Sequence, residues 1–215
     1  MVTASTADIA PPRRTQAERR DESERLLLGA TLAVVASRGV GAATLEEIGR
    51  EAGYSRGLAT QRFGSKQGLT EAVIGYLHRE REAILEADKV ADMPALQALA
   101  YYVEGHLRGL RHEAGARAYF MLLAAAVADG TEMREAFAAS HERVRVWLRA
   151  LLLRGQAEGD IRPEIDPDAG ALMIGSLLLG LSTQWLIDPS TPLDPIVATT
   201  IATLRQSFST HLSVP

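Results

Sequence analysis

Two short helical patterns meet at a glycine between residues 44 and 63, where the sequence reads TLEEIGREAGYSRGLATQRF. Thr44, followed three residues later by Glu47, forms a capping-box signature and predicts that a helix begins there. Gly53 ends this helix, and Ser55 predicts the N-terminal cap of a second one. Two helices this short and this close in sequence can cross only through a tight turn, so the segment predicts a helix–turn–helix.

The second of these helices carries residue types that read the edges of DNA bases. In a helix–turn–helix the second helix enters the major groove with its N-terminal residues foremost, and Arg and Gln bind guanine and adenine there. The cap of the first helix and a lysine just after the motif are expected to contact phosphates. The predicted DNA-binding residues are Thr44, Ser55, Arg56, Gly57, Leu58, Thr60, Gln61, Arg62 and Lys66. A helical hairpin whose polar residues simply face solvent would show a similar pattern.

The net charge of −4 hides a difference between the two ends of the chain. Residues 1–66 contain ten Lys and Arg against eight Asp and Glu, whereas the remainder contains thirteen against nineteen. Nucleic-acid binding depends on the local density of basic groups, so this balance fits a protein that meets DNA at one end. Ordinary variation in composition would fit it too. Four arginines precede or open the first predicted helix: Arg13, Arg14, Arg19 and Arg20. They either contact DNA beside the motif or only keep this segment soluble.

The rest of the sequence predicts an all-α fold of about nine helices, because no segment shows sustained alternation of period two. Thr15 with Glu18 predicts the capped start of the first helix, and Gly39 its end. Residues 1–14 begin small and polar and contain a Pro-Pro pair, so we expect a flexible N-terminal arm. The later helices are expected over 66–87, 95–111, 115–128, 132–157, 167–187 and 195–212.

The segment from Ala169 to Ile187 contains nineteen residues without a charge, a length that would cross a membrane. Aspartates flank it, neither end carries Lys or Arg, and polar residues lie inside it, so we favour a helix buried in a soluble protein. A helix that is apolar on all sides must be covered all round. We expect a second subunit to supply part of that cover, with Gly175 and Ser182 allowing the helices to approach closely.

Catalytic and metal-binding patterns are absent from the sequence. The five histidines are scattered, and there is no H-E-x-x-H, no glycine-rich phosphate loop and no nucleophile elbow. Cysteine is absent, which excludes disulfides and thiolate metal sites. We therefore expect no enzymatic activity, no cofactor and no metal. The N-terminus has no apolar run after a basic start, so we expect a cytoplasmic protein.

The stretch from Leu27 to Leu69 resembles the N-terminal pattern of the TetR family of bacterial transcriptional regulators. It shows the family's G-V-x-x-x-T start, then L-E-E-I-G-R-E-A-G, S-R-G and F-G-S-K-x-x-L. The resemblance implies contacts with bases and backbone along the second motif helix and phosphate contacts from the first cap and from Lys66. The family usually has a tyrosine at the position of Thr60 and a histidine or tyrosine at that of Arg62, so Arg62 would have to compensate for the missing backbone clamp.

The resemblance also implies a helix–turn–helix domain over 15–64 and a larger helical domain over 65–215, which dimerises through its last two helices and binds a small molecule among its middle helices. We expect a homodimer on an inverted-repeat operator, released by a hydrophobic or aromatic effector. The apolar positions expected at the dimer interface are Met173, Leu177, Leu178, Leu181, Trp185, Ile201, Leu204 and Phe208. The candidate effector contacts are Tyr101, Tyr102, His106, Tyr119, Phe120, Met121 and Trp147, although residues of these types at helical spacing are more often core than ligand contacts.

Two functions from different classes fit the sequence. The first is a ligand-responsive transcriptional regulator, most simply a repressor, although the protein sequence does not decide between repression and activation. The second is a helical small-molecule-binding protein whose helix–turn–helix is vestigial, for which the departures at Thr60 and Arg62 are the best support. A preference for an operator over random DNA separates the two.

Overall fold

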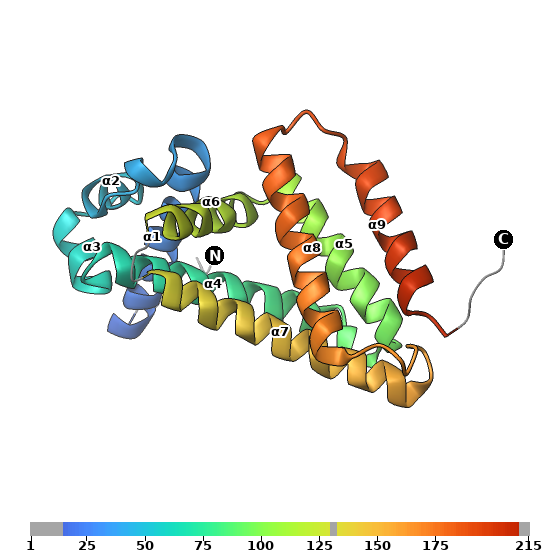
Figure 1. Cartoon of the computed structure of the whole chain (residues 1–215). Helices are drawn as coiled ribbons and strands as arrows, with labels where there is room; N and C mark the ends of the chain where they lie inside the picture. The colour runs from blue at the N-terminus through green and yellow to red at the C-terminus, as the bar shows by residue number, and fades with distance from the viewer. Residues whose placement is uncertain (1–14, 130–132, 211–215) are drawn as a thin grey trace, which may run out of the picture.

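The computed structural model describes residues 15–129 and 133–210, and within these ranges the protein consists of nine α-helices, two short 3₁₀ helices and no β-strand (Figure 1). The all-α prediction is confirmed. The arm predicted over 1–14 lies outside the described residues. The α-helices are α1 Gln16–Arg38, α2 Leu45–Glu51, α3 Arg56–Phe63, α4 Lys66–Ala87, α5 Ala95–His112, α6 Ala114–Asp129, α7 Met133–Glu158, α8 Pro167–Ile187 and α9 Leu193–Phe208.

Side-chain caps fix the helix starts that the sequence predicts. Thr15 and Glu18 form a reciprocal capping box at the start of α1, and Gly39 ends that helix. Ser55 and Ser65 each accept the backbone N–H of the third residue that follows, at the starts of α3 and α4. Each cap satisfies an N–H group that has no partner inside the helix, which is why a single hydroxyl decides where the helix begins.

α9 differs from its predicted range at both ends. It begins at Leu193, two residues early, because Pro195 fits the first turn of a helix, where its missing N–H has no helical acceptor to lose. It ends at Phe208, four residues early, because the chain becomes extended at Ser209 and pairs there with Ile161 as an isolated β-bridge. This bridge attaches the end of α9 to the loop between α7 and α8.

The helices form two groups, with α4 and α6 lying between them (Figure 1). α1, α2 and α3 lie at one end of the molecule, and α5, α8 and α9 lie at the other. α4 starts beside α3 and runs to the second group, where α7 packs on it, while α6 packs on α1. α6 contacts α1 in the first group and α5 and α8 in the second, whereas α4 contacts α1 and α3 in the first group and reaches the second through α7. A displacement of either helix therefore reaches the end of the molecule that carries the helix–turn–helix.

An apolar core runs through both groups of helices. Val35 of α1 and Ile48 of α2 are fully buried in the smaller group, and Leu107, Leu148 and Ile174 are fully buried where α5, α7 and α8 meet. Burying one such side chain stabilises the fold by about 1.5–3 kcal/mol. The buried apolar residues of both groups belong to one continuous cluster.

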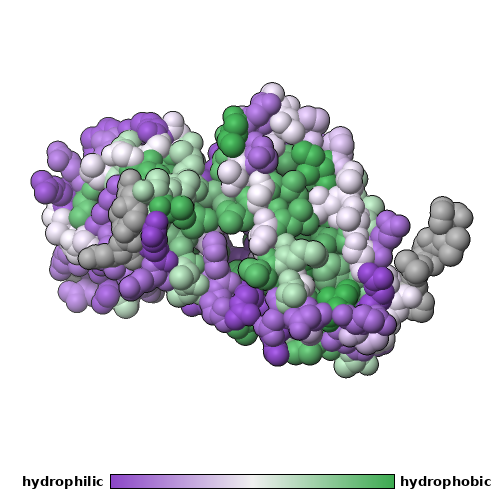
Figure 2. Space-filling view, in the orientation of Figure 1, coloured by the Kyte–Doolittle hydropathy of each residue, from purple (hydrophilic) through white to green (hydrophobic). Residues whose placement is uncertain are grey.

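α8 is the one helix in the described ranges that is long and apolar enough to cross a membrane by length and composition alone. Only 33% of its most apolar window is buried. One face of α8 packs on α7 and α5, whereas Leu172 and Met173 on other faces are 62% and 48% exposed. Figure 2 shows hydrophobic surface over α8 and between α8 and α9. The chain's own helices thus cover only part of this apolar helix.

Candidate DNA-binding interface and effector cavity

Two glycines allow α2 and α3 to cross closely. Gly53 lies in the turn with a φ of 76°, which glycine adopts without strain. Gly49 lies inside α2, where a Cβ would come within 3.0 Å of the backbone carbon and oxygen of Ser55. The Tyr54 N–H donates to the Gly49 carbonyl at 2.7 Å and closes the turn. The sequence predicts the role of Gly53 but not that of Gly49, because only the packing of the two helices sets this close approach.

α3 presents four of the predicted DNA-binding residues on one exposed face. Arg56, Gly57, Thr60 and Gln61 are all exposed, because these positions fall on one side of an α-helix. Ala59 is fully buried on the other side and holds α3 against the core. An arginine and a glutamine on an exposed helix face are placed as direct readout of base edges requires.

The remaining predicted residues of α3 are less available to a ligand outside the protein. The Ser55 hydroxyl accepts the Leu58 N–H at 3.2 Å as the helix cap, and the Leu58 side chain is partly buried. Arg62 Nη2 donates to Ser23 Oγ of α1 at 3.3 Å, and its Nε is buried without a hydrogen-bond partner. Residue 62 lies about 240° around the helix from Arg56. A DNA contact from Arg62 stays a prediction, and in this structure its guanidinium instead holds α3 against α1.

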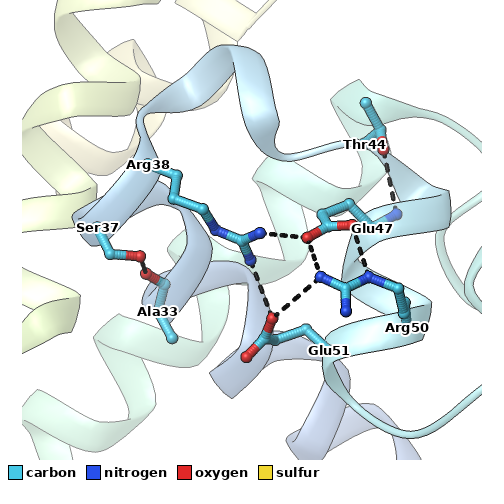
Figure 3. A network of polar contacts seen from close by, with 7 residues as sticks. All are labelled: Ala33, Ser37, Arg38, Thr44, Glu47, Arg50 and Glu51. Carbon is cyan, nitrogen blue, oxygen red and sulfur yellow. Dashed lines mark hydrogen bonds and ion pairs between the residues drawn. The ribbon is translucent and has the colours of Figure 1, made fainter.

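Four charged side chains hold α2 against α1 (Figure 3). The Glu47 carboxylate accepts hydrogen bonds from Arg50 and Arg38, and both arginines also reach Glu51. These bonds, that from Arg50 first, lower the pKa of Glu47 to about 2, so it is ionised at neutral pH. The capping box predicted at Thr44 is consequently only half formed: Thr44 Oγ1 accepts the Glu47 N–H at 3.1 Å, but the arginines occupy the Glu47 carboxylate.

Thr44 and Lys66 lie exposed at the starts of α2 and α4, on either side of α3 in the sequence. Helix starts carry N–H groups without helical partners and a partial positive charge. Lys66 Nζ approaches the Val40 carbonyl only at 3.5 Å, so its ammonium group keeps most of its hydrogen-bonding capacity. Phosphate contacts from both residues stay a prediction that these positions permit.

A cavity of about 480 Å³ lies among α4, α5, α6, α7 and α8, and Figure 2 shows the surface hollowed at the centre of the molecule. This volume is within the range of small-molecule sites, roughly 300–1,000 Å³. The ring centroids of Tyr102 and Trp147 are 4.8 Å apart, and those of His106 and Phe120 are 5.5 Å apart. Five of the seven predicted effector residues line this cavity: Tyr102, His106, Tyr119, Phe120 and Trp147.

Tyr101 and Met121, the other two predicted effector residues, are not among the residues that line the cavity. The Tyr101 hydroxyl donates instead to the Asp88 carboxylate, and Met121 packs partly buried against the core. Neighbouring residues of an α-helix point about 100° apart, and here Tyr102 lines the cavity whereas Tyr101 turns toward Asp88. A prediction of effector contacts from residue type alone therefore includes side chains that face away from the cavity.

Three polar side chains beside the cavity, those of His78, Tyr119 and Ser140, are connected by hydrogen bonds. His78 Nε2 and the Tyr119 hydroxyl both hydrogen-bond to Ser140 Oγ at 2.8 Å, and Ser140 is buried. Burial lowers the pKa of His78 and raises the pKa of Tyr119 to about 12, although the bond to Ser140 opposes the latter shift. All three groups are neutral at pH 7. The sequence does not predict these bonds, because they bring together residues of three helices.

His106 is a neutral polar group at the cavity wall. Its Nε2 lies 3.2 Å from Ser182 Oγ. Burial, assisted by the positive charge of Arg81, lowers the pKa of His106 to about 4. Over residues 15–129 and 133–210 no group of three His, Asp or Glu side chains is placed to hold a metal ion.

Several predicted dimer-interface residues lie in the protomer's own core. α8 and α9 pack on α5, and α8 also on α7, and the residues on those inner faces are no more than 8% exposed: Leu178, Trp185, Leu204 and Phe208. Ser182, expected to allow close approach of a partner, is fully buried beneath His106. Leu177, Leu181 and Ile201 are partly buried. The exposed side of α8 carries Met173, which is among the predicted interface residues, together with Leu172, Leu179 and the small residues Ser176 and Gly180. Leu172, Ser176 and Leu179 also line the cavity.

Two family models match the chain. Residues 27–73 match the model of bacterial regulatory proteins of the tetR family, and residues 106–208 match the C-terminal model of BetI-type transcriptional repressors. A comparison with curated proteins gives no match.

Solved structures share the fold at low sequence identity. A Rhodococcus sp. protein described as a TetR-family regulator is 22% identical, with a TM-score of 0.77 over 88% of this chain and 100% of its own. NalD, the secondary repressor of the MexAB-OprM efflux pump in Pseudomonas aeruginosa, is 21% identical, with a TM-score of 0.68 over 89% and 98%. SmeT in complex with triclosan is 21% identical, with a TM-score of 0.74 over 90% and 95%. With its helix–turn–helix and its helical C-terminal domain each matched, the chain belongs to the TetR family of bacterial transcriptional regulators.

Proposed function

We propose that this protein is a transcriptional repressor that binds an inverted-repeat operator as a homodimer, and that a small hydrophobic molecule in the cavity releases it. The observation that carries the proposal is the exposed face of α3, where Arg56, Thr60 and Gln61 point to solvent beside a tight glycine turn. Repression is favoured over activation because the matched C-terminal model describes transcriptional repressors. The protein would act in the cytoplasm, where bacterial DNA lies.

A dimer is favoured by the outer face of α8. One recognition helix makes few base contacts, and proteins of this kind place two of them about 34–36 Å apart, on successive turns of the same DNA face. Leu172 and Met173 expose apolar surface on a helix that has no charged residue from Ala169 to Ile187. Exposed apolar surface of this kind marks interaction sites, and the same face of a second copy would cover it by two-fold symmetry.

Replacing Met173 with glutamate is expected to dissociate the dimer. The wild-type protein should have twice the 23.2 kDa mass of one chain in solution, whereas Met173→Glu should have the monomer mass, because pairing would bury two unpartnered carboxylates. Light scattering at micromolar protein measures both. Leu26→Glu is the matched control, since Leu26 is exposed on α1, in the other group of helices. A monomeric wild-type protein, or a dimeric Met173→Glu variant, would contradict this interface.

The path from cavity to DNA runs through the helices that the two sites share. α4 follows α3 directly at Lys66 and lines the cavity from Ile74 to Leu85. Gly115, at the start of α6, also lines the cavity, and a Cβ there would meet the side chains of Leu77 and of Leu32 in α1. A ligand that separates α4 from α6 would move the helix–turn–helix as a unit and change the spacing of the two recognition helices. The triclosan held by SmeT is a precedent for a hydrophobic ligand in this fold.

Selection of DNA by the purified protein tests the proposed function. Fragments retained from a random pool should contain an inverted repeat with half-site centres about 10–11 base pairs, or a multiple of that, apart. Retention should fall steeply with salt, because each phosphate contact releases counterions. A fragment with one half-site scrambled is the control and should bind more weakly. Equal retention of selected and random DNA would sink the repressor proposal and favour a helical ligand-binding protein, a function with which the inward position of Arg62 agrees.

A further inference from the structure

Two polar groups that line the cavity have no partner among the described residues. The Arg81 side chain of α4 makes no ion pair and no hydrogen bond there, and the Tyr102 hydroxyl of α5 makes no hydrogen bond there. Tyr102 is only 8% exposed. The Tyr102 hydroxyl is not among the buried atoms of the described residues that lack a partner, so it is open to the cavity and free to bond a ligand there.

Arg81 and Tyr102 lie close together. Arg81 Nη1 is 3.4 Å from the position that a Cβ on Gly105 would occupy, so the guanidinium rests against α5 where that helix has no side chain. Tyr102, Gly105 and His106 share this face of α5, at spacings of three and four residues. The charge of Arg81 opposes the burial that raises the pKa of Tyr102, and it helps burial to lower that of His106. One cation therefore acts on both groups.

The other cationic groups of the cavity are paired, neutral or exposed. Arg145 binds Glu142 and Asp168, at 2.7 and 2.9 Å. Burial lowers the pKa of His141, and His78 and His106 are likewise neutral at pH 7 for the same reason. Arg143 also makes no ion pair with a described residue, but its side chain is exposed. Its positive charge helps to lower the pKa of His78, which is hydrogen-bonded to Ser140. Arg81 is thus the cation that a ligand inside the cavity would meet beside Tyr102.

We infer that the effector is an amphipathic monocarboxylate, whose carboxylate pairs with Arg81 and accepts the Tyr102 hydroxyl. Its hydrocarbon body would pack on Trp147 and Phe120. A guanidinium and a carboxylate match in shape and charge and form two parallel hydrogen bonds, and a single arginine balances a single negative charge. This inference gives the ligand class of the effector in the proposed function and rests on that proposal for its regulatory meaning.

Decanoate and 1-decanol are the probes, because they share a hydrocarbon chain and differ in the head group. Trp147 packs against Tyr102 at the cavity wall with their rings tilted by 42°, so ligand entry should change its fluorescence, with calorimetry as a second measurement. We expect decanoate to bind the wild-type protein at least about 10-fold more tightly than decanol, since charge-assisted hydrogen bonds are roughly twice as strong as neutral ones. Equal affinities for the two probes would overturn the inference.

Arg81→Met keeps the length of the side chain and removes its charge, and it should abolish the preference for decanoate. Arg81→Lys should restore part of it. Arg143→Met is the matched control, since Arg143 also lines the cavity without an ion pair, and it should keep the full preference. A preference that survives Arg81→Met, or that disappears only in Arg143→Met, would overturn the assignment to Arg81. Circular dichroism of each variant verifies that it is folded.

Operator binding by the same preparations separates this inference from the proposed function. If the wild-type protein retains its operator but only uncharged ligands release it, the monocarboxylate inference fails and the repressor proposal stands. If decanoate binds through Arg81 but no DNA sequence is preferred, the proposed function fails and the ligand class stands. Release of the operator by decanoate from the wild-type protein, and not from Arg81→Met, supports both.

Discussion

Arg56→Ala is expected to weaken binding to the selected operator by at least about 30-fold. Arg56 is exposed in the first turn of α3, the part of a recognition helix that lies deepest in the major groove. A bidentate arginine–guanine contact contributes about 1–3 kcal/mol to discrimination, and a homodimer loses two of them. Titration of a labelled operator fragment, followed by gel retention at fixed salt, measures the loss. Binding of random DNA should change much less, because non-specific affinity comes from phosphate contacts.

Two further arginine variants test whether the loss of operator affinity is specific to position 56. Arg79→Ala is the matched control, because Arg79 is an exposed arginine about 20 Å along α4 from Lys66. It should leave operator affinity unchanged. Arg62→Ala should weaken binding less than Arg56→Ala, because Arg62 binds Ser23 and not the outer surface. Unchanged affinity in Arg56→Ala would mean that α3 does not read the operator through this residue.

The fold is predictable from the sequence because its boundaries are set by local chemistry. Thr15, Ser55 and Ser65 cap helices through bonds that span three residues, and Gly53 supplies a positive φ that the turn requires. Such features need no knowledge of distant contacts. The end of α9 is the counterexample, since it depends on the bridge between Ser209 and Ile161, which are far apart in the sequence.

The direction in which each site residue faces is less predictable, because it depends on how helices pack. Periodicity places Arg62 outside the face that Arg56, Gly57, Thr60 and Gln61 share, whereas residue type alone makes both arginines candidates for base contacts. Residue type likewise makes both Tyr101 and Tyr102 candidates for effector contacts, but only Tyr102 lines the cavity. α8 is apolar on every side, so the sequence alone does not distinguish its inner face from its outer face. Leu178 and Trp185 are therefore predicted at the surface of the protomer, but in the structure both are buried in it.

The groups that give the cavity its chemistry come from separate helices, and no motif connects them. Arg81 of α4 meets Tyr102 of α5 because those two helices border the same cavity and Gly105 leaves space between them. In the sequence Arg81 belongs to a run of charged residues, HREREA, that is typical of a solvated helix face. That no acidic side chain of residues 15–129 and 133–210 forms an ion pair with Arg81 is visible only once all five helices around the cavity are in place.

Gly68→Ala is expected to lower the free energy of unfolding by about 3 kcal/mol or more, the largest effect on stability that we predict. A Cβ at residue 68 would overlap the Phe63 carbonyl oxygen. That oxygen cannot move aside, because it accepts the Ser65 N–H at 2.7 Å and belongs to the last residue of α3. The start of α4 would have to shift away from α3, and overpacking of this kind costs about 1–3 kcal/mol, occasionally more.

Thermal unfolding followed by circular dichroism measures this effect. For a chain of this length 1 kcal/mol corresponds to a change in Tm of about 2–4 °C, so Gly68→Ala should lower Tm by roughly 6–12 °C. Gly29→Ala is the control, because Gly29 is a helical glycine of α1 with no atom within 4 Å of the added Cβ. It should raise the stability by up to about 1 kcal/mol, the helix-propensity difference between Ala and Gly. Because the α3–α4 junction also positions the recognition helix, Gly68→Ala should lose operator affinity in the fraction that is still folded. If instead both variants were stabilised alike, the contact between Gly68 and Phe63 would not constrain this junction.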